Sequence, residues 1–305
     1  MQTVTAPAVS ARMDASPRTR DVRALVELAK PGITLMEVVT AAVGYWVSQP
    51  WLRMELWEVL FRLSLLSVGV LFLGASAGTF NHLLERSTDA MMQRTSFRPL
   101  PEGRISVAVA RIFAWFLFGI GICTLLPLGW TVTILGAATI LLYTIVYTPL
   151  KTKTALALYL GGIPGALPVI GGWVAGGGSL FSIEAAILGA IMYWWQLPHF
   201  LALAIMFAED YRRGGIILLA GGNAKRIAIH TLIHAVLLIV SSAAWLAWGR
   251  GGVLYALGWG IFSVWLLVRC VQLVRQPDTN SGRRELIATY MFLMGLFLFM
   301  AVDVR

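Results

Sequence analysis

Apolar runs separated by short polar segments make up most of the chain from residue 32 onward. A helix needs roughly 20 consecutive apolar residues to cross the hydrocarbon core of a bilayer. Runs of about this length cover residues 32–49, 58–80, 105–126, 128–148, 155–175, 181–208, 227–248, 252–273 and 286–303. The pattern predicts an all-α integral membrane protein, built as a bundle of nine transmembrane helices.

Breaks inside the runs refine this picture. A Pro127-Leu128-Gly129 break divides residues 105–148, which together would be too long for one span. The fifth run, residues 155–175, is rich in glycine and proline. Such a sequence favours a kinked helix that packs closely against its neighbours.

Composition and charge agree with a membrane protein. Hydrophobic residues make up 58% of the chain and charged residues 13%, whereas soluble domains are nearer half apolar and a quarter charged. The net charge is +9, but the basic residues occur in short groups between apolar runs. This distribution is typical of a topology signal rather than of nucleic-acid binding. The two cysteines lie inside apolar runs, so no disulfide framework is expected.

The basic residues also orient the bundle. With the N-terminus inside, eighteen Lys and Arg residues fall on the cytoplasmic side and three on the other, as the positive-inside rule requires. We expect a polar cytoplasmic tail over residues 1–30, disordered at its start and with a short interfacial helix over residues 21–29. A transmembrane domain over residues 31–305 would follow, located in the cell inner membrane.

Candidate chemistry lies in the loop after the second run. Asn81, Glu85 and Asp89 are four residues apart, so on a helix their side chains share one face. Two carboxylates on one stripe repel and lose solvation at a membrane edge, and a bound divalent cation removes that penalty. Oxygen ligands of this kind favour Mg²⁺, which binds through one or two carboxylates together with substrate phosphates.

Basic residues follow this acidic stripe. Arg94 and Arg98 are placed where they could neutralise a diphosphate through bidentate hydrogen bonds. A solvated loop whose arginines only set the topology is the plainer alternative. It does not account for an ordered Asn/Glu/Asp stripe that is followed by Arg-Thr and Arg-Pro.

A second acidic pair, Glu209-Asp210, follows the sixth run and therefore faces the same cytoplasmic side. Two acidic clusters can then meet at the mouth of one central cavity that opens to the cytoplasmic side. Metal and arginine groups would capture a diphosphate there, and the apolar bundle behind would hold its hydrocarbon chain. This is the physical outline of a membrane prenyltransferase.

Several stretches of the chain match one known pattern. They are Lys30-Pro31-Gly32-Ile33-Thr34, Asn81 to Ser106, Tyr147-Thr148-Pro149-Leu150-Lys151, Gly161 to Pro168, Trp195-Gln196-Leu197-Pro198-His199-Phe200 and Asp210-Tyr211. Through these stretches the chain resembles the membrane-embedded aromatic prenyltransferase superfamily, and within it the members that farnesylate haem b. The loop from Arg94-Thr95 to Ser106 is the most specific element of the resemblance.

The resemblance implies a reaction and its residues. A farnesyl group would pass from farnesyl diphosphate to a vinyl carbon of haem b, and water would complete a hydroxyl. With Mg²⁺ as the cofactor, it assigns Asn81, Glu85 and Asp89 to a first catalytic metal-diphosphate site and Asp210, with Glu209, to a second. The implied substrate-binding residues are Arg94, Arg98, Lys151, His199 and Tyr211. Haem-A-forming or oxidase-assembly proteins are the implied partners that take the product.

The chain departs from the family pattern at two places. Glu85 stands where many members have Asp, and residues 216–220 replace the usual stretch after Asp210. Other polar residues keep more than one reading: Glu37 is a candidate for the cavity wall, and His230 and His234 have the spacing to share a ligand.

Two alternative functions are compatible with the same cavity. One keeps the diphosphate site but takes a quinone precursor, a chlorin or a lipid as acceptor. Another replaces catalysis by haem handling or transport, which would predict polar residues at mid-membrane depth in matching halves. The strongest polar residues gather at one face, which favours an enzyme.

Overall fold

A computed structural model describes residues 21–304, so the start of the expected N-terminal tail, with its predicted disorder, lies outside the described residues. Apart from loops and one isolated antiparallel bridge between Gly251 and Val304, the described chain is helical. The α-helices are α1 (Val22–Leu28), α2 (Pro31–Val47), α3 (Leu56–Leu84), α4 (Arg86–Met91), α5 (Val107–Leu125), α6 (Trp130–Leu141), α7 (Thr148–Leu150), α8 (Ala157–Ala175), α9 (Ile183–Met206), α10 (Ala208–Arg213), α11 (Ala224–Ala247), α12 (Val253–Arg275) and α13 (Thr279–Val302). Short 3₁₀ turns η2 (Pro50–Leu52), η3 (Leu126–Leu128) and η5 (Leu219–Gly222) and a π-helical segment η4 (Leu142–Tyr147) connect them.

Each of the nine expected spans coincides with a long helix. Among the described residues, eight helices are long and apolar enough to cross a membrane, the third of them formed by α6, η4 and α7 together. The remaining span is α2, which is slightly shorter at 17 residues. The interfacial helix expected over residues 21–29 is α1. The predicted all-α membrane bundle is confirmed.

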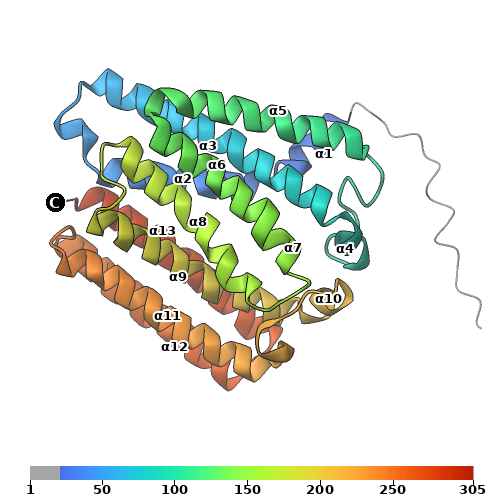
Figure 1. The fold of residues 1–305 in the computed structure, drawn as a ribbon. Coiled ribbons are helices and arrows are strands. Elements are labelled where there is room, and N and C mark those ends of the chain that lie inside the picture. Colours follow the sequence, from blue (N-terminus) through green and yellow to red (C-terminus); the bar gives the residue numbers. More distant parts are fainter. Residues whose placement is uncertain (1–20, 305) are drawn as a thin grey trace, which may run out of the picture.

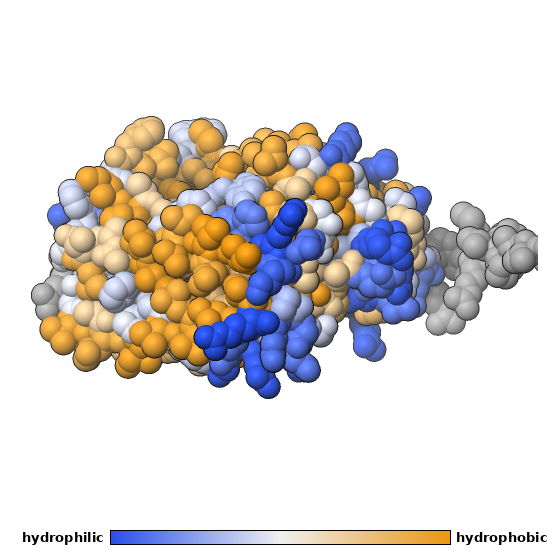
Figure 2. Space-filling model, turned by 90° about the horizontal axis from the view of Figure 1, so that it is seen from below, coloured by the Kyte–Doolittle hydropathy of each residue, from blue (hydrophilic) through white to orange (hydrophobic). Residues whose placement is uncertain are grey.

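The long helices run side by side as one bundle (Figure 1). α3, α5 and α6 form one side and α11 and α12 the other, while α9 is the most enclosed of the eight long spans. The short helices α1, α4 and α10 gather at the end opposite the C-terminus. Figure 2 shows hydrophilic side chains collected towards that end and mostly hydrophobic side chains over the rest of the face.

Polar residues fix where the long helices begin. Ser106, Ser182 and Asn223 precede α5, α9 and α11, and each side chain accepts a hydrogen bond from the backbone N–H three residues on. These bonds satisfy amide groups that a helix start leaves without partners. α2 instead begins with Pro31 at its first position, where the missing N–H costs nothing.

Small residues let α2 and α8 approach closely. A Cβ atom added to Gly172 of α8 would overlap the backbone carbonyl of Ala41, and one added to Gly44 of α2 would overlap the carbonyl of Val169. The expectation of close packing in the glycine-rich fifth span is therefore confirmed. Pro164 and Pro168 lie inside α8, which remains one helix from Ala157 to Ala175.

The contact between α2 and α8 yields a matched pair of variants. Gly172→Ala forces two backbones apart and should destabilise the protein by about 1–3 kcal/mol. Gly171→Ala, one residue earlier, has nothing within 4 Å of the added atom and should be neutral or slightly stabilising. Thermal unfolding in detergent measures both, and equal midpoints for the two variants would contradict the described packing.

Candidate active site

A cavity of about 460 Å³ lies within the bundle and extends to the end that carries α4 and α10. Its size is within the range of ligand-binding pockets. Apolar residues of α2, α8, α9 and α13 form most of its depth. Eight of the predicted site residues line it: Asn81, Glu85, Asp89, Arg94, Arg98, Lys151, His199 and Tyr211.

Asn81 lies in the last turn of α3 and is buried. Its Oδ1 atom accepts a hydrogen bond from Nζ of Lys30, the residue that precedes α2. Its Nδ2 atom donates to Oγ1 of Thr148 at 3.3 Å. The amide thus connects three segments at the end of the bundle, α2, α3 and α7.

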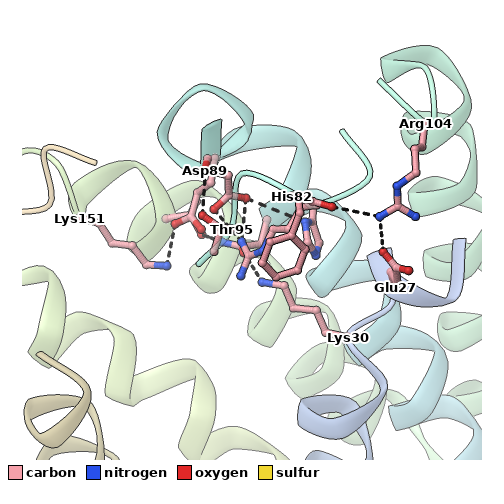
Figure 3. A network of polar contacts seen from close by, with 12 residues as sticks. Glu27, Lys30, His82, Asp89, Thr95, Arg104 and Lys151 are labelled. Carbon is pink, nitrogen blue, oxygen red and sulfur yellow. Dashed lines mark hydrogen bonds and ion pairs between the residues drawn. The ribbon is translucent and has the colours of Figure 1, made fainter. Parts of the chain in front are cut away.

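Both carboxylates of the predicted stripe are paired with cations. Glu85 accepts a hydrogen bond of 2.7 Å from Nζ of Lys151, whose ammonium group also lies 4.4 Å from the ring centroid of Tyr147. Asp89 is fully buried, and both of its oxygens lie 2.7 Å from Nη1 of Arg98. Figure 3 shows Lys151 and Lys30 approaching this cluster from different segments.

The acidic stripe crosses a break between two helices. α3 ends at Leu84, Glu85 follows as its cap, and Asp89 belongs to α4. The turn is nevertheless helical in its bonding, because the Glu85 amide donates to the Asn81 carbonyl at 2.9 Å and the Asp89 amide to the Glu85 carbonyl at 2.7 Å. The predicted shared face is therefore retained although the helix is not continuous.

Asp210 joins the second acidic segment to the first loop. Its two carboxylate oxygens accept hydrogen bonds of 3.0 Å from the backbone amides of Gln93 and Arg94. Glu209, in contrast, is exposed and pairs with Arg212 at 2.7 Å. Asp210 thus holds the loop whose Arg94 lines the cavity, although Asp210 itself does not line it, and Glu209 lies on the outside of α10.

Cations outnumber carboxylates at the mouth. The mouth contains four cationic side chains and two carboxylates, namely Lys30, Arg94, Arg98 and Lys151 against Glu85 and Asp89, while a third carboxylate, Glu37, lines the cavity deeper along α2. Burial, with Arg98 and Lys151 nearby, lowers the pKa of Lys30 to about 7. Burial opposes ionisation of Glu85, but Lys151 and Lys30 outweigh it and hold its pKa below the usual value. Such a site attracts an anion that carries several charges.

An aromatic group surrounds His199 deeper in the cavity. The Nδ1 atom of His199 lies 3.2 Å from Oγ1 of Thr289, and its ring stacks on Trp195 with centroids 5.0 Å apart. Tyr290 meets the same ring edge-on at 4.7 Å. One face of the wall is therefore aromatic and contains an imidazole.

Two residues of the cluster were missed from the sequence. The sequence shows Lys30 only as part of the Lys30-Pro31 motif, and it favours an interface role for His82, off the acidic stripe. His82 is buried with Nδ1 4.0 Å from Oδ2 of Asp89. Its signal was the spacing of seven residues between the two, which places them on one helical face.

His230 and His234 lie apart from this site. Their rings stack with centroids 6.1 Å apart, and His234 also stacks on Trp194 at 5.9 Å. Neither lines the cavity. Within the described residues, no group of three His, Cys, Asp or Glu side chains gathers as a metal site, so any metal here needs Asn81 or a substrate oxygen as a ligand.

Comparison with known proteins adds the family. The profile described as the UbiA prenyltransferase family matches residues 38–296. A protoheme IX farnesyltransferase of Flavobacterium johnsoniae is 31% identical over 95% of this chain and 99% of its own. Another with the same name, from Rhodopseudomonas palustris, is 33% identical over 95% of this chain and 93% of its own.

Solved structures show the same fold at low identity. A UbiA homolog from Aeropyrum pernix K1 superposes with a TM-score of 0.72 at 18% identity, over 88% of this chain and 98% of that one. A UbiA homolog from Archaeoglobus fulgidus, bound to GPP and Mg²⁺, gives a TM-score of 0.62 at 14% identity, over 90% of this chain and 99% of that one.

The hydrogen bonds that Asp210 accepts from the Gln93 and Arg94 amides predict that substitutions of Asp210 and of Glu209 will affect this loop differently. Asp210→Asn replaces one of the two acceptor oxygens by an NH₂ group, which cannot accept, so the loop should loosen by about 1–3 kcal/mol. Hydrogen exchange of the amides in residues 92–98 should then speed up about tenfold or more. Glu209→Gln should leave this exchange unchanged. Equal effects of the two variants would contradict the assignment of Asp210 as the residue that holds the loop.

Proposed function

The chain belongs to the UbiA prenyltransferase family, and we propose that it transfers a farnesyl group from farnesyl diphosphate to a vinyl carbon of haem b, with addition of water. One observation carries the proposal: an apolar intramembrane cavity ends in a mouth where cations outnumber carboxylates. This arrangement suits a substrate with a multiply charged head and a long hydrocarbon tail. The acceptor and the farnesyl donor are argued from relatives called protoheme IX farnesyltransferase that match nearly the whole chain.

The donor set fits Mg²⁺. Asn81, Glu85 and Asp89 present oxygen atoms on one face, and hard oxygen ligands suit this ion. Each now accepts from a cation, so a metal can replace Lys30, Lys151 and Arg98 as the partner of these oxygens. Bound there, Mg²⁺ would neutralise charge on the diphosphate oxygens. Asp210 retains lone pairs that could reach a second ion.

The cations released from these oxygens then serve the leaving group. Lys30, Lys151 and Arg98 would turn to the diphosphate, and Arg94, held by the bond from its amide to Asp210, would add a fourth charge. Positive groups fixed where negative charge develops lower the barrier to ionisation. The bond between C1 and oxygen breaks, its electron pair leaves with diphosphate, and an allylic cation remains in the cavity.

The acceptor would lie deeper, against the aromatic wall. His199, Trp195 and Tyr290 form an aromatic wall against which a porphyrin ring would pack, and Tyr211 also lines the cavity. Ile33 and Tyr290 line the cavity and are also exposed on the outside of the bundle, which offers an apolar substrate access from the bilayer. The same relatives give no support to a quinone precursor, a chlorin or a lipid as acceptor.

The orientation belongs to this proposal as well. The mouth lies at the end where hydrophilic side chains collect (Figure 2), and the basic loops predict that this end is cytoplasmic. We place the protein in the cell inner membrane with its N-terminus inside. The product would pass to haem-A-forming or oxidase-assembly proteins.

The test is an assay of purified protein with haem b, farnesyl diphosphate and Mg²⁺, followed by mass spectrometry of the haem. Wild type should yield a farnesylated, hydrated haem. Asp89→Ala removes one anchor of the cation cluster and should reduce turnover by about a hundredfold or more. If haem returns unchanged while diphosphate is released onto another acceptor, haem is not the acceptor.

A further inference from the structure

Glu37 is an acid of the cavity that the diphosphate site does not use. It lies on α2, seven residues after Lys30, which places it on the same helical face about 10 Å deeper in the membrane. It lines the large cavity, yet no described side chain or backbone group makes a hydrogen bond or ion pair with its carboxyl group. An ionisable side chain at this depth costs free energy, and its presence there therefore indicates a function.

The carboxyl group lies at the boundary between two spaces. One is the large cavity, and the other is a small pocket of about 40 Å³ between α3, α6 and α8. Only Glu37 and Thr139 contribute polar side chains to the small pocket, and both also line the large cavity. A volume of this size can hold water, and water in an apolar site needs at least two polar partners. The Glu37 carboxylate and the Thr139 hydroxyl supply them.

The fold ensures that this carboxyl group faces the two spaces. Gly74 of α3 lies directly against it, and a Cβ atom at that position would overlap Oε2 of Glu37. The carboxyl tip therefore occupies room that only a glycine leaves. The hydroxyl of Thr40, the next polar residue along α2, donates to the carbonyl of Met36 at 2.7 Å and so does not compete for Glu37.

The proposed reaction sets two opposite demands on water. Water that reaches the allylic cation would quench it to free alcohol, so the cavity must exclude bulk solvent. One water molecule must still add after the new carbon–carbon bond has formed. A side pocket with a single acid at its entrance meets both demands, because it keeps water near the reacting carbons and out of bulk exchange.

We propose that Glu37 is the proton acceptor that activates this water, an inference that rests on the proposed function. The vinyl terminal carbon bonds to C1 of the farnesyl group, and the positive charge moves to the carbon attached to the porphyrin. The oxygen of the water bonds to that carbon, and the Glu37 carboxylate takes one of its protons. The product is an alcohol, and no electron donor or acceptor is needed.

The test measures which product forms. With haem b, farnesyl diphosphate, Mg²⁺ and H₂¹⁸O, the wild type should incorporate ¹⁸O into farnesylated haem. Glu37→Gln is nearly isosteric and should still transfer the farnesyl group. Its intermediate should instead lose a proton from the adjacent carbon to released diphosphate. The ratio of alcohol to an alkene lighter by one water should fall by at least about tenfold.

Three further variants keep the test falsifiable. Gly74→Ala displaces the Glu37 carboxyl without removing it and should also lower the ratio. Gly189→Ala adds a methyl group against Ile170, outside both spaces, so it controls for packing and should keep the wild-type ratio. Glu184→Gln, at the other end of the bundle on α9, should behave as wild type.

The outcomes separate the two claims. If wild type does not farnesylate haem b, the proposed function fails. If wild type is active and Glu37→Gln gives alcohol in the wild-type ratio, the role of Glu37 is overturned. It is equally overturned if Glu37→Gln loses farnesyl transfer altogether while substrate binding remains.

Discussion

The site depends on buried charges that neutralise one another at the membrane edge. Glu85 with Lys151 and Asp89 with Arg98 form short ion pairs inside a wall that is otherwise largely apolar. A charge in such surroundings is costly unless it is paired. Each cation is supplied by a different segment of the chain, so the pairs hold the ends of the helices in register. In the proposed function, the same pairs store the cations that the diphosphate would require.

The apolar part of the bundle completes the arrangement. α9 lies at its centre and presents His199 and Trp195 to the cavity, while α2 presents Glu37 from another wall. Close packing of α2 on α8 through Gly172 and Gly44 fixes where Glu37 lies. Charge along the cavity wall is thereby confined to the mouth and to one deeper acid, Glu37, which is the distribution needed to ionise a prenyl diphosphate while keeping bulk water away.

Much of this was predictable from the sequence. Hydrophobic run lengths gave the helices because each span must satisfy its own backbone hydrogen bonds in lipid, and the four-residue spacing placed Asn81, Glu85 and Asp89 together. The partners of these residues were less predictable. That Lys30 meets Asn81, and that Asp210 binds the amides of Gln93 and Arg94, depends on contacts between distant segments. Glu209 and Asp210 look alike in sequence, and only the direction of α10 separates them.

The central claim is that a metal displaces the cations from the carboxylates and frees them for diphosphate. The most direct measurement is the affinity for a non-reactive farnesyl thiodiphosphate, with Mg²⁺ and with a chelator, in wild type and in Asp89→Asn. Coupling of the two ligands predicts at least about tenfold tighter binding with Mg²⁺ in wild type, and a much smaller gain in the variant. Equal affinity with and without Mg²⁺, or an equal gain in both proteins, would contradict the account.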